Sequence, residues 1–204
     1  MDARMLSLLS RRSLLAGAAA ALGVAALPHG AFALDAGSAR ALIDKAVGEV
    51  NGIISSGQSE GAMLGSFEKL FARYADVPAI ARSALGPAAR SASKGDLAAF
   101  TKAFQGYIAR KYGRRFREFI GGRIEVTDAR PIKSYFEVIT VAYLKGESPF
   151  DVRWHVADKS GKDLFFNIII EGVNMLASER AEIGAMLDRR QGDIGALVED
   201  LKKA

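Results

Sequence analysis

Apolar side chains recur every three or four positions from residue 38 to residue 119, which is the spacing of helices that bury one face. Four helices are predicted there: from a cap at Ser38 to about Ser56, from after Ser59 to about Tyr74, from a cap at Asp76 to Gly86, and from a cap at Asp96 to Gly121, with a bend or an interruption at Gly113 as the alternative for the last one. The stripe of the last helix is rich in aromatic residues, namely Phe100, Phe104, Tyr107, Tyr112, Phe116 and Phe119.

The pattern changes to alternation between residues 123 and 170, which predicts strands at 123–130, 135–145, 149–157 and 163–170. In the third strand the apolar residues point one way, so the interleaved His155 is expected on an exposed polar face. The fourth strand is apolar on both faces and needs helices to cover one of them. Two closing helices are predicted at 175–190 and 193–203. This order of helices, strands and helices predicts an α+β fold with an antiparallel sheet of about four strands.

Residues 1–33 have the features of an export signal. Arg11 and Arg12 precede an apolar run from Leu14 to Leu27, and the run from Ala31 to Ala33 fits a signal-peptidase site. The apolar run, about 14 residues, is too short to cross a bilayer as a helix. The paired arginines indicate the twin-arginine (Tat) route. We therefore expect a Tat-like signal peptide at 1–33, a periplasmic location and one domain at 34–204; an uncleaved membrane anchor is the alternative.

The amino-acid composition limits the kinds of site and partner that the chain can have. The chain has no cysteine, which excludes disulfides and a lipidated cysteine at the cleavage site. The net charge of +5 is too small to argue for a nucleic-acid partner. No phosphate-binding glycine loop is present, and His155 is the only histidine after residue 33. We therefore expect no cofactor, no metal site and no enzymatic activity.

Three segments carry a family resemblance. They are the run from Phe67 to Gly86, the aromatic positions Phe100, Phe104 and Tyr112, and a C-terminal set made of Glu171-Gly172-Val173-Asn174-Met175, Arg180 and the run from Gly192 to Leu197. Together they are similar to the signature of the MlaC family, also called toluene-tolerance proteins, which are periplasmic phospholipid-binding components of the maintenance-of-lipid-asymmetry ABC transport system. The chain departs from the family pattern at Ala89-Arg90, where a Trp-Arg pair is usual, at Asn167, where Asp is usual, and at Glu179, where an aromatic residue is frequent.

The resemblance implies a curved sheet similar to the nuclear-transport-factor-2 (NTF2-like) fold, wrapped by the N- and C-terminal helices around an apolar cavity. It implies a diacyl phospholipid as cargo, carried between an outer-membrane lipoprotein–porin complex and the MCE-type subunit of an inner-membrane ABC transporter.

A carrier has to cover its cargo. Each buried methylene contributes about 0.8 kcal/mol, so moving roughly 30 methylenes of a diacyl lipid through water uncovered would cost on the order of 20 kcal/mol or more. A roomy pocket of apolar side chains without charge at depth is therefore expected. Candidate lining residues are Phe67, Phe71, Phe104, Ile108, Tyr112, Ile139, Val141, Tyr143, Val152, Trp154, Phe166, Ile168 and Met175. The alternative at each position is ordinary close-packed core.

Cations cluster beside the aromatic stripe. Arg110, Arg114, Arg115 and Arg117 are candidates for contacting a lipid headgroup or an acidic patch of a partner, and a solvated helix face is the alternative. Arg180 is expected to pair with Asp76 or Glu171 and so to fix the fold.

Two other functions stay open at this point. One is an envelope adaptor whose apolar residues form only a packed core. The other is a pocket enzyme acting on a small hydrophobic substrate, for which Asp76 with Tyr112 or Tyr143 would be the candidate site.

Overall fold

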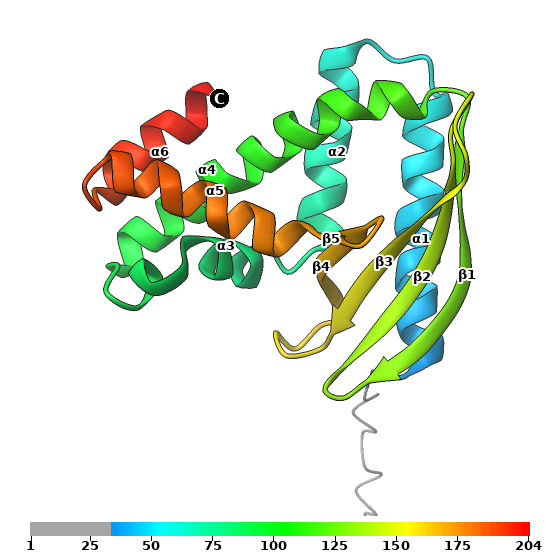
Figure 1. Cartoon of the computed structure of the whole chain (residues 1–204), viewed down its shortest axis with the longest axis horizontal. Helices are drawn as coiled ribbons and strands as arrows, with labels where there is room; N and C mark the ends of the chain where they lie inside the picture. The colour runs from blue at the N-terminus through cyan, green and yellow to red at the C-terminus, as the bar shows by residue number, and fades with distance from the viewer. Residues whose placement is uncertain (1–33) are drawn as a thin grey trace, which may run out of the picture. The chain divides into compact units, whose positions relative to one another are not determined.

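Within residues 34–204, four α-helices precede the sheet, as predicted. In the computed structural model α1 (Ala36–Ser55), α2 (Glu60–Tyr74) and α3 (Val77–Leu85) follow one another (Figure 1). Helix α1 begins earlier than predicted because the Asp35 carboxylate accepts a hydrogen bond from the Ser38 backbone at 2.7 Å, while the Ser38 hydroxyl accepts one from the Asp35 backbone at 2.9 Å. This reciprocal capping satisfies two otherwise unpaired N–H groups. The structure describes residues 34–204, so the predicted signal peptide lies outside the described residues.

The long aromatic helix is shorter than predicted. Helix α4 (Lys94–Gly113) is capped by Ser93, whose hydroxyl accepts a hydrogen bond from the Asp96 backbone at 3.0 Å. The helix ends at Gly113, where α2 passes so close that a Cβ would lie 2.3 Å from a methyl group of Leu64, so only glycine fits at this position. The chain continues as the 3₁₀ helix η2 (Arg114–Phe119), and a shorter 3₁₀ helix, η1 (Gly86–Arg90), precedes α4.

The sheet has five antiparallel strands in sequence order, one more than predicted. They are β1 (Arg123–Ile132), β2 (Tyr135–Tyr143), β3 (Phe150–Ala157), β4 (Leu164–Ile170) and β5 (Val173–Asn174). The additional strand β5 has only two residues and pairs with β4 immediately before α5 (Met175–Arg189). The final helix is α6 (Ile194–Lys203), capped by Asp193 as predicted.

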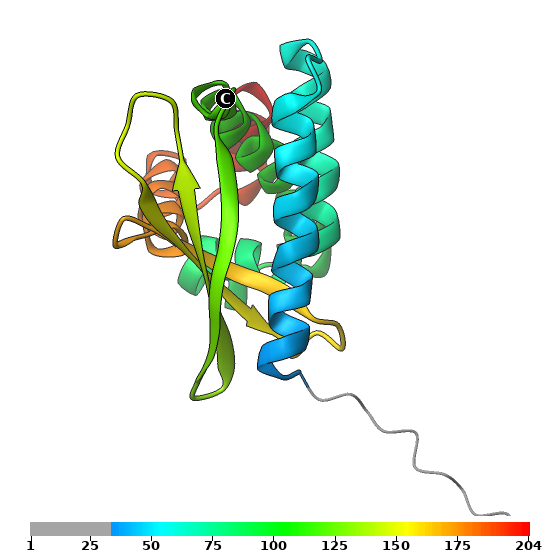
Figure 2. The same ribbon diagram turned by 90° about the vertical axis from the view of Figure 1, so that its right-hand side faces the viewer.

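Helix α1 covers one face of the sheet and also its edge (Figure 2). Its buried residues Ile43, Val47, Val50 and Ile54 belong to the same core as Val138 and Ala142 of β2. At the free edge of β1, the Asn51 side chain donates a hydrogen bond to the Ile124 carbonyl and accepts one from the Ile124 N–H, both at 3.0 Å. The amide therefore occupies the place of a neighbouring strand and closes an edge that would otherwise be free to pair.

The remaining helices gather beyond the β4 side of the sheet (Figure 1). Helix α4 packs against α2, α3 and α6, and α5 packs mainly against α3 and β4. Within residues 34–204, no helix is long and apolar enough to span a membrane.

Candidate functional site

The sheet register divides the predicted lining residues between two faces. Val138 pairs with Trp154 and Trp154 with Ile168, so Trp154 and Ile168 lie on the buried face with Val138. Ile139 pairs with Arg153, which places Ile139 on the opposite face. Because side chains alternate along a strand, Val141 and Tyr143 share the face of Ile139, and Val152 shares the face of Trp154. The predicted set therefore cannot line a single cavity; the buried face of β2 is formed instead by Phe136, Val138, Thr140 and Ala142.

The candidates on helices are packed against one another and against the sheet. Phe67, Phe104 and Ile108 are buried, while Phe71, Tyr112 and Met175 are partly exposed. The ring of Phe71 lies 6.2 Å from that of Phe165, which in turn meets the Trp154 ring edge-on at 5.2 Å. Phe166, in contrast, lies at a bulge of β4 beside Tyr135 and His155 on the other face.

Two hollows of about 290 and 350 Å³ lie in the part of the chain that the structure describes. The first is lined largely by polar residues of α1, α2 and the loop between them, and the second lies between the η1 region and the start of α6. Neither hollow is bordered by any candidate lining residue. Phe100 and Phe104 of α4 and Val138 and Val156 of the sheet are completely buried, so the core around them is closely packed.

The predicted basic rim is only partly available for a ligand. The Arg110 guanidinium donates hydrogen bonds to the carbonyl of Leu201 at 2.5 Å and to that of Ala204 at 2.9 Å. It therefore holds the C-terminal end of α6, where a cation is also favourable for the helix dipole. This corrects the expectation that Arg110 contacts a headgroup or a partner. Arg114 is exposed, and the side chains of Arg115 and Arg117 lie outside the described residues.

Two further expectations about charged residues are wrong. Arg180 makes no ion pair with Asp76 or Glu171 among the described residues; its guanidinium lies beside Gly86, and Asp76 accepts a hydrogen bond from the Ala79 backbone at the start of α3. The proposed enzyme pair is not assembled either, because Asp76 is engaged in this cap while Tyr112 bonds to α5.

His155 is buried rather than exposed, with 7% of its surface accessible. Its Nε2 lies 3.5 Å from Glu137, its Nδ1 lies 3.4 Å from the Asn167 amide, and the Tyr135 ring is centred 4.6 Å away. Burial lowers the pKa of His155, although the Glu137 carboxylate opposes this effect. Alternation along β3 placed His155 on the correct face, but it could not show that neighbouring strands cover that face.

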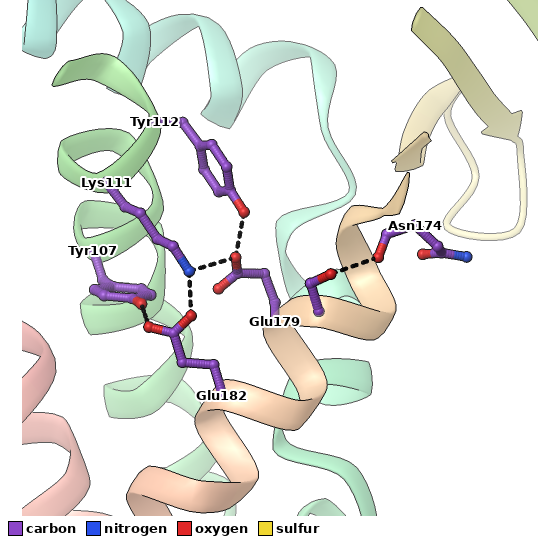
Figure 3. Close-up of polar contacts among 7 residues, drawn as sticks. Tyr107, Lys111, Tyr112, Asn174, Glu179 and Glu182 are labelled. Atoms are coloured by element: carbon purple, nitrogen blue, oxygen red, sulfur yellow. Dashed lines mark hydrogen bonds and ion pairs between the residues drawn. The ribbon is translucent and has the colours of Figure 1, made fainter. Parts of the chain in front are cut away.

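A polar cluster that the sequence analysis missed connects α4 to α5 (Figure 3). The Lys111 ammonium donates to Glu179 at 2.8 Å and also to Glu182, and the Tyr112 hydroxyl donates to the same oxygen of Glu179. The Tyr107 hydroxyl donates to Glu182 at 2.5 Å. We refer to these five residues as the α4–α5 bridge. The signal was available in the spacing, since residues 107 and 111, and residues 179 and 182, each fall on one helix face.

Ionisation in the α4–α5 bridge follows from these contacts. Burial, reinforced by the hydrogen bond to Glu182, raises the pKa of Tyr107 to about 12, and burial also raises the pKa of Tyr112. Burial alone would lower the pKa of Lys111, but its bonds to both glutamates outweigh it and raise that pKa. At neutral pH the tyrosines therefore act as hydrogen-bond donors and Lys111 as a cation.

Comparison with known proteins gives a family and a fold. A family model described as "MlaC protein" matches residues 44–203. A solved phospholipid-binding protein from Ralstonia solanacearum, in complex with a phospholipid, is similar in structure with a TM-score of 0.70. The sequences are 17% identical, and the match covers 81% of this chain and 95% of the other. Among curated proteins, none matches this chain.

Proposed function

Because the chain belongs to the MlaC family, whose model matches residues 44–203, we propose that it is a carrier of phospholipid and not an enzyme. The observation that carries the proposal is the combination of this family membership with a shared fold: the similar solved structure is of a protein that holds a phospholipid. Within residues 34–204, no group of histidine, cysteine, aspartate or glutamate side chains is arranged to hold a metal ion.

The interior supplies the apolar surface that the cargo requires. Phe71, Trp154 and Phe165 are in ring contact where α2 meets the sheet, and Ile168 pairs with Trp154 on the same face. We place the acyl chains against this buried face of β3 and β4, between the sheet and the helices. Because Trp154 and Phe165 are buried and in ring contact there, the helices must move apart from the sheet to admit lipid.

The finer parts of the proposal come from the sequence. The Tat-like signal at 1–33 supports export to the periplasm, where the protein would move phospholipid between an outer-membrane complex and an MCE-type subunit of an inner-membrane ABC transporter. Arg114, Arg115 and Arg117 remain candidates for contact with these partners or with the headgroup. Arg110 is left out because its guanidinium already donates hydrogen bonds to the backbone oxygens of Leu201 and Ala204.

The test is direct loading. Purified protein is analysed by native mass spectrometry as isolated, after delipidation, and after incubation with vesicles of a defined diacyl phospholipid. We expect one added lipid mass per chain before delipidation and after incubation. Protein that carries no lipid and acquires none would refute the proposal.

A second function is supported by one observation, the complete burial of core side chains such as Phe100, Phe104 and Val138. An envelope adaptor whose apolar residues form only a core would show this same packing. The loading experiment separates the two, since an adaptor gives the mass of the bare chain in all three samples.

A further inference from the structure

Helices α4 and α5 are joined by a group of polar side chains. Helix α5 packs mainly against α3 and β4, whereas its connection to α4 runs through the long polar side chains of the α4–α5 bridge (Figure 3). By contrast, α4 packs closely along α6, where Leu197, Val198 and Leu201 are buried. The described side-chain contacts that cross the boundary between α4 and α5 are therefore hydrogen bonds and ion pairs.

One atom of the bridge is not satisfied. Glu179 is 3% exposed, and its Oε1 accepts bonds from both Lys111 and Tyr112, whereas Oε2 has no hydrogen-bond partner in the described part of the chain. A buried carboxylate oxygen without a donor loses hydration and gains nothing in return. The desolvation of the pair therefore offsets much of the attraction between Glu179 and Lys111, so the bridge closes the boundary without strongly stabilising it.

Opening such a boundary has a low cost. When polar groups separate, each exchanges a protein partner for water, and the orphaned Oε2 gains hydrogen bonds that it lacks in the closed state. Separating an apolar boundary of the same size would instead expose hydrocarbon. The bridge also borders the apolar interior, since Tyr112 and the neighbouring Leu176 pack against the buried cluster that contains Trp154 and Phe165.

From these observations, and resting on the proposed carrier function, we propose that acyl chains enter and leave the protein between α4 and α5, and that the α4–α5 bridge controls the rate of this exchange. Lys111, Glu179 and Glu182 hold the boundary shut, and Tyr112 fastens Glu179 from the side of α4. The bridge acts on the rate of passage, whereas the apolar interior supplies the affinity.

The first test weakens the bridge by one hydrogen bond. Tyr112→Phe keeps the ring and removes the hydroxyl that bonds to Glu179. We expect exchange of a fluorescent phospholipid between protein and vesicles to become faster by about tenfold, since a hydrogen bond to a charged group is lost from the closed state. Tyr74→Phe is the matched control, because it removes a tyrosine–glutamate bond of 2.7 Å, to Glu49, between α2 and α1. An unchanged rate in Tyr112→Phe, or an equal increase in both variants, would overturn the proposal.

The second test locks the boundary. The chain has no cysteine, so Lys111→Cys with Glu182→Cys can be joined selectively by a short bismaleimide that contains a reducible bond. Glu179→Gln is added because Lys111→Cys removes the cation that faces the buried Glu179 carboxylate. The control pair, Arg190→Cys with Asp200→Cys in the same Gln background, replaces an ion pair between the end of α5 and α6.

We expect the α4–α5 cross-link to stop lipid uptake and reduction of the linker to restore it, whereas the control cross-link leaves uptake unchanged. Uptake at equal rates in the cross-linked and reduced forms shows that lipid does not pass between α4 and α5, and refutes the inference while leaving the carrier function intact. If the wild-type protein takes up no lipid at all, the carrier function fails and the inference fails with it.

Discussion

Thr140 and Trp154 form a hydrogen-bonded pair inside the sheet whose contribution can be isolated. The Trp154 indole N–H donates to the Thr140 hydroxyl at 3.0 Å, and this hydroxyl donates to the Val152 carbonyl at 3.0 Å. Thr140 is completely buried and Trp154 is 7% exposed. Thr140→Val preserves the shape of the side chain but leaves the indole N–H buried without an acceptor.

We expect Thr140→Val to lower the free energy of unfolding by about 2 kcal/mol, because a buried donor that loses its partner costs about 1–3 kcal/mol. For a domain of this size the melting temperature should fall by about 4–8 °C. Trp154 is the single tryptophan of the chain, so its fluorescence reports urea unfolding directly.

A double-mutant cycle tests the cause. In a Trp154→Phe background no indole donor remains, and Thr140→Val should then cost less than about 0.5 kcal/mol when unfolding is followed by circular dichroism. If Thr140→Val is equally destabilising in both backgrounds, the loss of the indole hydrogen bond is not the source of the effect, and the reasoning is refuted.

Three other predictions concern the sheet. Asn51→Ala should lower the free energy of unfolding by about 1–3 kcal/mol in urea denaturation and increase self-association in light scattering, since both edge groups of Ile124 lose their partners; a change below about 0.5 kcal/mol would contradict this. Ile168→Asp should abolish lipid retention in native mass spectrometry because the charge lies on the buried face, whereas Ile169→Asp, on the other face, should retain lipid; equal retention would place the cargo elsewhere. Burial lowers the pKa of His155 in the folded protein, so near the ordinary histidine pKa the unfolded chain binds more protons than the folded chain. The free energy of unfolding should therefore fall as the pH is lowered from 7.5 through about 6.5. His155→Gln should show a flatter pH dependence, and equal slopes in the two proteins would disprove the assignment to His155.

Local signals were sufficient for most elements of the fold. Asp76 and Asp193 were recognised as caps, and both carboxylates accept the expected backbone bonds at the starts of α3 and α6. The start of α4 was predicted at Asp96, but the cap is Ser93, whose hydroxyl bonds to both the carboxylate and the backbone N–H of Asp96. Serine and aspartate are both common cap residues, so the sequence alone did not distinguish the two positions. The need for glycine at position 113, where α4 ends, comes from the close approach of Leu64, and periodicity within α4 contains no information about that residue.

The candidate site was harder to predict because it depends on register. The pairing of Ile139 with Arg153 decides which face Ile139 occupies, and hydrophobicity cannot decide this for a strand in which Val138, Ile139 and Val141 are all apolar. The α4–α5 bridge was missed for a similar reason, because Lys111 and Glu179 become adjacent only when α5 packs onto α3.

Helices α1 and α5, which we take as two walls of the proposed cargo space, differ in how much apolar surface holds them in place. Helix α1 buries the large residues Ile43, Val47, Val50 and Ile54, which at about 1.5–3 kcal/mol each contribute on the order of 6–12 kcal/mol. Helix α5 buries only Ile183 and Leu187 beside the half-satisfied Glu179, which amounts to about 3–6 kcal/mol. Partial opening should therefore begin at α5.

Native-state hydrogen exchange measures this order without any lipid. Amide protons of α5 should exchange through a local opening at a free energy several kcal/mol below that of α1, whose protons should exchange only with global unfolding. Tyr112→Phe should lower the opening free energy of α5 and leave that of α1 unchanged. Equal protection of the two helices would mean that α5 is held by more than its few apolar contacts and the bridge, and that the wall of the cargo space does not move at this boundary.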